Sequence, residues 1–278
     1  MMKLKQKRRE AALRKELLAV EKQEKKIQQA ALKARSAAWK EELENWIPEK
    51  VYTGLESACC KGFGLVFNQG RVIIEKGYNK EKIQTEHAIR DSAVQAKGRR
   101  KELRKIHKSA RQSDFLNLTV TTVEGIGLGA LGVGMPDIVL FLGTLLKGIY
   151  ETALNYGFDY ESKSEQILIL KMMQTSLSTG EDWMTRNTEV DEMLILETIG
   201  ITDEDIKQQM KETASAFAMD MLLLKFIQGL PIVGMIGGAA NPVYYRKVMK
   251  YVQLKYRKRY LLKQNETATN IISLHFSH

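Results

Sequence analysis

Carboxylates beside a glycine run are the groups in this chain whose types and spacing could support catalysis. Glu124 and Asp137 flank the run and could form a pair for acid–base chemistry. An acid at the start of a helix usually caps that helix, so we interpret Asp137 as a capping residue. Glu124 requires a partner if it is buried in so apolar a neighbourhood. A hydrolase-like enzyme that uses this neighbourhood therefore remains an alternative function.

The glycine run also matches the dinucleotide fingerprint GxGxxG at Gly127, Gly129 and Gly132. In that fingerprint a helix continues from the third glycine and holds the pyrophosphate at its N-terminus. Here Gly134 and Pro136 interrupt the chain at once, and no succession of βαβ units follows. The run therefore favours close helix packing over nucleotide binding, because glycine lets backbones approach each other.

Other nucleophiles and metal ligands are sparse. The two cysteines, Cys59 and Cys60, are adjacent and lack the spacing of a structural zinc site. His87 and His107 lie in charged helical sequence, and the other two histidines lie within the last four residues. No hydrolase elbow, Walker loop or HExxH helix is present. We therefore predict no catalytic residue, no bound metal and no cofactor.

Positive charge is clustered along the chain, which has a net charge of +10. Residues 1–40 contain thirteen Lys or Arg against four Glu, and residues 97–111 contain eight against one. Residues 181–212 are acidic, with ten Asp or Glu against three basic residues. A third basic group near the end comprises Arg246, Lys247, Lys250, Lys255, Arg257, Lys258 and Arg259. Such clustering predicts an electrically polarised surface.

A helical projection of residues 244–260 separates a basic arc from an apolar arc. Lys255 and Arg259 fall within the apolar arc, where we expect their long side chains to extend to solvent. The alternative to a solvated basic face is a surface that binds anionic lipid or nucleic acid. The predicted contacts with an anionic surface are Arg99, Arg100, Lys101, Arg104, Arg246, Lys250 and Arg257.

Three segments follow from the periodicity. Spacings of three and four from Leu13 to Ala38 predict one long helix, whose stripe is narrow and includes Glu24. We therefore expect residues 1–45 to form a basic helical arm that packs shallowly. Pro48 marks the start of a helical domain over residues 46–263, and residues 264–278 are expected to be a flexible tail.

Two apolar, glycine-rich stretches, residues 119–159 and 225–246, share one order: an apolar run, glycines, a proline and a new helix. Prolines, glycines and polar residues interrupt them, so buried helical hairpins are favoured over membrane spans. The first stretch predicts a helix that opens at Pro136 and ends near Tyr156 and Gly157. The fold class is thus all-α: a compact multi-helix domain with two such hairpins and a basic N-terminal arm.

The succession of these motifs over about residues 50–262 resembles the EcsC family. The resemblance implies a bacterial-type helical protein whose function is associated with transport or takes place near a membrane. It implies no catalytic residue in this chain. The long basic arm departs from a minimal member of the family. The positions that carry the resemblance are Glu124, Gly125, Gly127, Gly129, Gly132, Asp137, Tyr156, Gly157, Asp159, Pro231, Gly234, Gly238 and Asn241.

We therefore expect a cytoplasmic binding or accessory protein. Its partner would be an anionic membrane surface or a membrane protein complex at the inner face of the cell membrane. The absence of a signal-peptide pattern and the two unspaced cysteines favour the reducing cytoplasm. An enzyme and a nonspecific nucleic-acid binder remain the alternatives.

Overall fold

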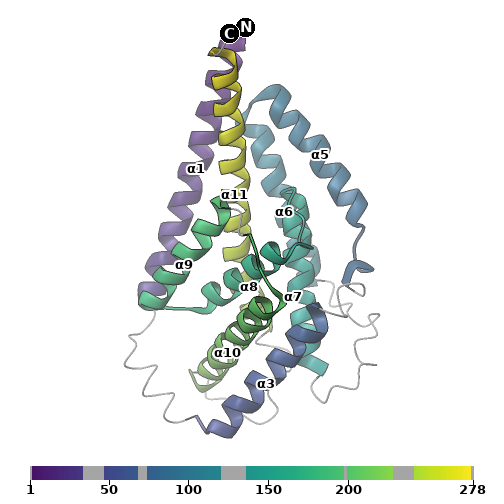
Figure 1. Ribbon diagram of the computed structural model, residues 1–278, viewed down its shortest axis with the longest axis vertical. Helices are drawn as coiled ribbons and strands as arrows, with labels where there is room; N and C mark the ends of the chain where they lie inside the picture. Colours follow the sequence, from purple (N-terminus) through teal and green to yellow (C-terminus); the bar gives the residue numbers. More distant parts are fainter. Residues whose placement is uncertain are drawn as a thin grey trace.

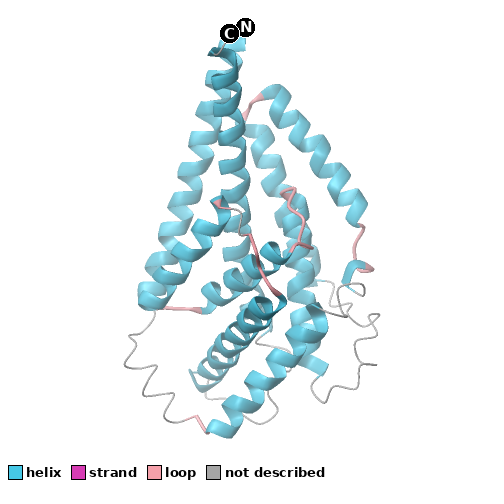
Figure 2. Cartoon of the chain, in the orientation of Figure 1, coloured by secondary structure: helices cyan, strands magenta, loops and turns pink. Residues whose placement is uncertain are grey.

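The regular structure is helical throughout the part of the chain that the computed structural model describes, which confirms the all-α prediction (Figures 1 and 2). The described residues are 2–33, 47–67, 74–119, 136–196, 199–227 and 241–276. They contain α1 (Met2–Lys33), α3 (Glu49–Leu65), α5 (Lys80–Lys97), α6 (Arg100–Thr119), α7 (Pro136–Asn155), α8 (Lys163–Leu177), α9 (Gly180–Ile195), α10 (Asp203–Ile227) and α11 (Asn241–Phe276).

The apolar core centres on α7 and α8. On α7, Leu142, Leu145 and Ile149 are completely buried, and the helix packs against α3, α5, α6 and α11. A run of apolar side chains on α8 from Ile167 to Met173 is buried against α10 and α11. Full burial of such a side chain contributes about 1.5–3 kcal/mol, so these two helices organise the others around them.

Local signals at the helix ends agree with the sequence. The helix that was predicted to open at Pro136 is α7, and the chain leaves it at Gly157, whose φ is +77°. Asn79 and Ser162 cap α5 and α8 by accepting hydrogen bonds from the backbone N–H groups of Lys82 and Glu165. Residues 120–135 and 228–240 lie outside the described residues, so the two buried glycine-rich hairpins stay a prediction.

The N-terminal helix does not pack shallowly, and this part of the prediction is wrong. Leu13 and Val20 are each 1% exposed, and α1 lies antiparallel to α11 while also contacting α6 and α9 (Figure 1). The narrow stripe suffices because its acids, Glu16 and Glu24, bind cations of α11. The predicted boundary at residue 45 lies outside the described residues.

The segment that was predicted to be a flexible tail begins inside α11. This helix continues without a break to Phe276, and Gln264 is only 5% exposed. The described part of the tail is therefore helical, and its first residue belongs to the packed body of the molecule.

Candidate functional site

The turn between α5 and α6 packs directly on α1. Gly98 ends α5 with a left-handed φ of +55° and donates its N–H to Val94 O at 2.9 Å. A Cβ at this position would lie 3.0 Å from the Cβ of Arg9 and 3.5 Å from the carbonyl oxygen of Lys5. Glycine therefore fits both the backbone geometry and the close contact. The turn brings the basic run of residues 97–111 against the basic start of α1.

A polar hub at Gln264 holds these elements together. Its side-chain oxygen accepts hydrogen bonds from Arg9 at 3.0 Å and from Gln95 at 2.8 Å. Its Nε2 donates to Asp91 at 2.8 Å, and Asp91 also accepts from the Tyr260 hydroxyl at 2.7 Å. The hub joins α1, α5 and α11, so the C-terminal part of α11 fixes the basic turn.

Exposed cations gather around this contact. Residues 5–10 and 97–104 are all described, and Glu10 is the one exposed acid within these two ranges. The other acid, Glu102, is buried and pairs with Lys105 at 2.8 Å. We define the basic patch by the exposed cations Lys5, Lys7, Arg8, Lys97, Arg99, Lys101 and Arg104. Its excess of positive charge is suited to a polyanionic partner.

The predicted anionic-surface contacts fall into three groups. Arg99, Lys101 and Arg104 belong to the basic patch, and Arg100 beside them is engaged with Glu16 at 2.5 Å. Arg246 and Lys250 are exposed near the start of α11. Arg246 precedes Gln264 by 18 residues, about 27 Å along a helix, so these two cations lie away from the patch.

Arg257, the last of the predicted surface contacts, is not on the surface. Its side chain is 7% exposed and forms an ion pair with Glu16, which is 2% exposed. Burial opposes ionisation of Glu16, but hydrogen bonds from Arg100 and Arg257 outweigh it and lower the pKa of this carboxyl. Arg257 therefore has an internal partner and is removed from the set of surface contacts.

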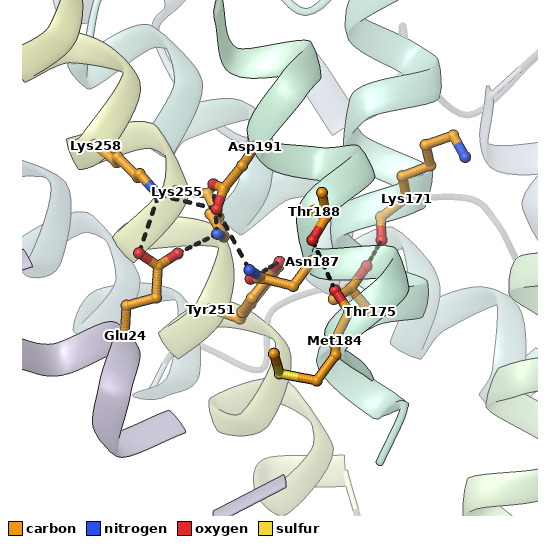
Figure 3. Close-up of polar contacts among 10 residues, drawn as sticks. All are labelled: Glu24, Lys171, Thr175, Met184, Asn187, Thr188, Asp191, Tyr251, Lys255 and Lys258. Atoms are coloured by element: carbon orange, nitrogen blue, oxygen red, sulfur yellow. Dashed lines mark hydrogen bonds and ion pairs between the residues drawn. The ribbon is translucent and has the colours of Figure 1, made fainter. Parts of the chain in front are cut away.

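Lys255 likewise does not extend to solvent as predicted. It is fully buried and pairs with Glu24 of α1 and, at 2.7 Å, with Asp191 of α9 (Figure 3). Lys258 binds the same two acids at 3.0 and 2.9 Å. The Lys255 ammonium also lies 5.2 Å from the centre of the Tyr251 ring.

We call the ion-paired residues that join α1, α9 and α11 the interhelix ionic network; they are Glu16, Glu24, Asp191, Lys255, Arg257 and Lys258. Arg259, which was also expected to reach solvent, binds the buried Glu165 at 2.6 Å beside this network. A helical projection cannot predict the burial of these cations, because it describes the faces of one helix and contains no information on the helices that pack against them.

The segment after α7 forms a packed corner. The Tyr156 hydroxyl is buried 2.9 Å from Nδ1 of His107, and burial raises the pKa of Tyr156. A Cβ at Gly157 would lie 2.2 Å from Nε2 of His87, whose Nδ1 donates to Asn155 O at 2.9 Å. Asp159 is exposed, and its carboxylate accepts the Glu161 N–H at 3.1 Å in the next turn.

Comparison with known proteins identifies the family. Residues 11–261 match the EcsC protein family, which is most of the chain. The chain belongs to the EcsC protein family. It is also 27% identical over 154 residues to "Uncharacterized protein YdbA" of Bacillus subtilis (strain 168). That match covers 51% of this chain and 53% of YdbA, so the chain spans about half the length of this curated relative. No solved structure gives a significant match.

The EcsC resemblance proposed from the sequence is thus confirmed, and its matched region begins within α1. Of the motif positions, Tyr156, Gly157 and Asp159 form the corner described above, where the contacts are those of packing and turn formation. The remaining positions, or their side chains, lie outside the described residues: Glu124, Gly125, Gly127, Gly129, Gly132, Asp137, Pro231, Gly234, Gly238 and Asn241. The suggested pairing of Glu124 with Asp137 accordingly stays a prediction.

Burial raises the pKa of both cysteine thiols, Cys59 and Cys60, in this EcsC protein. Cys59 is completely buried, and burial raises the pKa of its thiol to about 12, far from the range of a reactive thiolate. Among the described residues, no group of three or more His, Cys, Asp or Glu side chains could hold a metal ion. The basic patch is therefore the candidate functional site that the geometry supports best.

Proposed function

We propose that this EcsC protein is a cytoplasmic binding or accessory protein that associates peripherally with the anionic inner face of the cell membrane. The basic patch makes the contact, and the lipid phosphates are its partners. The observation that carries the proposal is the contact of Gly98 with α1. This contact brings together two basic runs that are distant in the sequence, residues 5–10 and 97–104, and these two runs contain one exposed acid, Glu10.

The expected attachment is electrostatic and reversible. Each Lys or Arg near an anionic leaflet contributes about 1 kcal/mol, so the seven cations of the patch together suffice for binding. This attraction decays over about 8 Å at physiological ionic strength and weakens as salt rises. Within the described part of the chain, no helix combines the length and apolarity that a membrane span requires.

Vesicle flotation tests the proposal. The full-length protein should float with vesicles that contain phosphatidylglycerol, remain unbound with pure phosphatidylcholine vesicles, and leave the anionic vesicles in high salt without detergent. Replacing Lys97, Arg99 and Lys101 together by glutamine should lower the bound fraction several-fold, because these side chains are exposed on the patch.

A matched variant separates the patch from net charge. Replacing Lys50, Lys61 and Lys211 by glutamine removes the same charge from exposed positions on α3 and α10, outside the patch and outside the predicted contacts. Binding should persist in this control. Equal loss in both variants would contradict a localised site, and protein that resists salt and requires detergent would contradict peripheral attachment.

Nucleic acid is the competing polyanion in this experiment. Duplex DNA would also bind exposed Lys and Arg side chains with a steep dependence on salt. We expect the vesicles to retain the protein when duplex DNA is added at equal phosphate concentration. Transfer of the protein to DNA under these conditions would overturn the membrane proposal.

A further inference from the structure

A second candidate site lies away from the basic patch, in a pocket bounded by α3, α8, α9 and α10. Its volume is about 410 Å³, which is within the usual range for small-molecule sites. Leu177, Ala216 and Met219 give it an apolar part, and the rest of its lining is mostly polar. The pocket is therefore able to hold a small molecule that has both an apolar portion and polar groups.

The inner polar groups are fixed by hydrogen bonds. The Tyr52 hydroxyl and Ser215 Oγ lie 2.5 Å apart across α3 and α10. Gln174, which is 3% exposed, accepts from Gln209 Nε2 at 2.8 Å through its side-chain oxygen. The hydrogen bonds of Gln174 within the described structure do not use its Nε2 group, so that donor is available at the pocket wall.

Arg186 of α9 supplies an unsatisfied donor at this pocket. Its Nε atom is buried and makes no hydrogen bond to any described residue. Arg186 forms an ion pair with Asp182 one turn earlier on α9, but the Oδ2 atom lies 3.6 Å from Nε, too far for a hydrogen bond, and the Asp182 side chain is 63% exposed. A buried N–H without an acceptor is costly, whereas a bound carboxylate would satisfy it.

Glu212 of α10 supplies the opposite charge on another wall. It is partly buried and accepts a hydrogen bond from Gln208 at 3.1 Å, but no cation of the described chain pairs with it. Asp220, which also lines the pocket, is neutralised by Lys247 at 3.1 Å. Arg186 is thus held by one long ion pair, to the largely exposed Asp182, and Glu212 has no cationic partner among the described residues.

We propose that this pocket binds a small zwitterion, a molecule that carries a carboxylate and an ammonium group as free amino acids do. Arg186 receives the carboxylate, Glu212 receives the ammonium group, and Leu177 and Met219 contact the apolar portion. Charge-assisted hydrogen bonds at both ends give the recognition its specificity. This binding is independent of membrane association.

Thermal-shift screening followed by calorimetry tests the proposal with the twenty common L-amino acids as probes. At least one should raise the melting temperature at millimolar concentration, because a ligand that binds only the folded state stabilises it. The best amino acid is then compared with the amine that lacks its carboxylate and the acid that lacks its ammonium group. Each analogue should bind about tenfold more weakly or worse. No binding by any amino acid, or equal binding by either analogue, would overturn the proposal.

Two pocket variants identify the binding groups. Arg186→Gln and Glu212→Gln should each weaken amino-acid binding by about tenfold or more. Lys207→Gln and Glu204→Gln are matched controls, because these side chains form an exposed ion pair elsewhere on α10. Both control variants should bind the amino acid as tightly as the wild-type protein does. Unchanged affinity in both pocket variants would refute the assignment. Melting without ligand checks that each variant folds, and unaltered flotation of Arg186→Gln separates this site from the basic patch.

Discussion

The basic patch and the interhelix ionic network contain the same types of side chain, lysine and arginine, in opposite environments. In the patch, Lys97, Arg99 and Lys101 face water with few acids nearby. In the network, Lys255 and Arg257 are enclosed between helices and meet acids of α1 and α9. Solvated cations cost little and can exchange partners, whereas enclosed cations require permanent ones. The exposed cations of the patch are therefore suited to binding an external partner, whereas the buried cations of the network hold the helices of this chain together.

The largest expected effect is the loss of a buried acid. Glu16→Gln should lower the free energy of unfolding by about 3–5 kcal/mol, because Arg257 then remains buried without a countercharge. Denaturant titration measures this change. Glu10→Gln, an exposed position on the same helix, should be nearly neutral. Equal stability of the two variants would show that the network does not hold α1.

A second mutation sharpens this prediction. Combining Glu16→Gln with Arg257→Met removes both buried charges and should recover part of the lost stability, since apolar side chains often replace buried ion pairs without loss. Failure of the double variant to exceed the single variant would argue that the cost comes from altered packing. The comparison therefore distinguishes an uncompensated charge from a disturbed helix contact.

The next effect is a dependence on pH at the edge of the network. Burial first, and then the neighbouring cations Arg257 and Arg111, lower the pKa of His107 to about 4. In the unfolded chain a histidine has a pKa of about 6.5, so the unfolded state binds the additional proton between these values. The contribution of neutral His107 to the free energy of unfolding, about 3 kcal/mol, is present above pH 6.5 and is lost as the pH falls towards 4.

His107→Gln tests this assignment. We expect the difference in unfolding free energy between pH 7.5 and pH 5 to be smaller in the variant, since glutamine does not titrate. His275→Gln provides a control with the same substitution. Identical pH profiles for wild-type protein and His107→Gln would contradict the prediction that His107 is held neutral.

The smallest expected change in stability is at the patch. Replacing Lys97, Arg99 and Lys101 together by glutamine should alter the free energy of unfolding by about 0.5 kcal/mol or less, although vesicle binding falls. Denaturant titration beside flotation measures both quantities on one protein. A large loss of stability would show that these cations have internal roles and would erase the contrast with the network.

Local features of the fold were predictable because their causes are local. Pro136 opens α7 and Gly157 closes its end, as the sequence indicated. The partners of Lys255 and Arg257 were not predictable, because they lie far away in the sequence: Glu16 and Glu24 of α1 precede them by more than 200 residues, and Asp191 of α9 precedes Lys255 by 64. Glu24 signalled a weak stripe in the sequence, yet it is the countercharge that fixes α1 in place.

The candidate sites show the same division. Arg99, Lys101 and Arg104 could be chosen from charge density alone, but their proximity to Lys5 and Arg9 depends on the Gly98 contact. Arg186 could not be predicted as a site residue, since it lies in an acidic region of the sequence. Its place in a pocket follows only from the packing of four helices. Sequence thus identifies side chains with suitable chemistry, whereas packing decides which of them share a site.

The antiparallel pairing of α1 with α11 has a consequence for the order of events during synthesis. Glu16 leaves the ribosome 241 residues before Arg257, which corresponds to about 10–50 s at a rate of about 5–20 residues per second. Arg100 becomes available to Glu16 after 84 residues, but Arg257 and the two lysines that pair with Glu24 are made only with α11, after α7 and α8. The docking of α1 on α11 is therefore the closing step that joins the first part of the chain to the last.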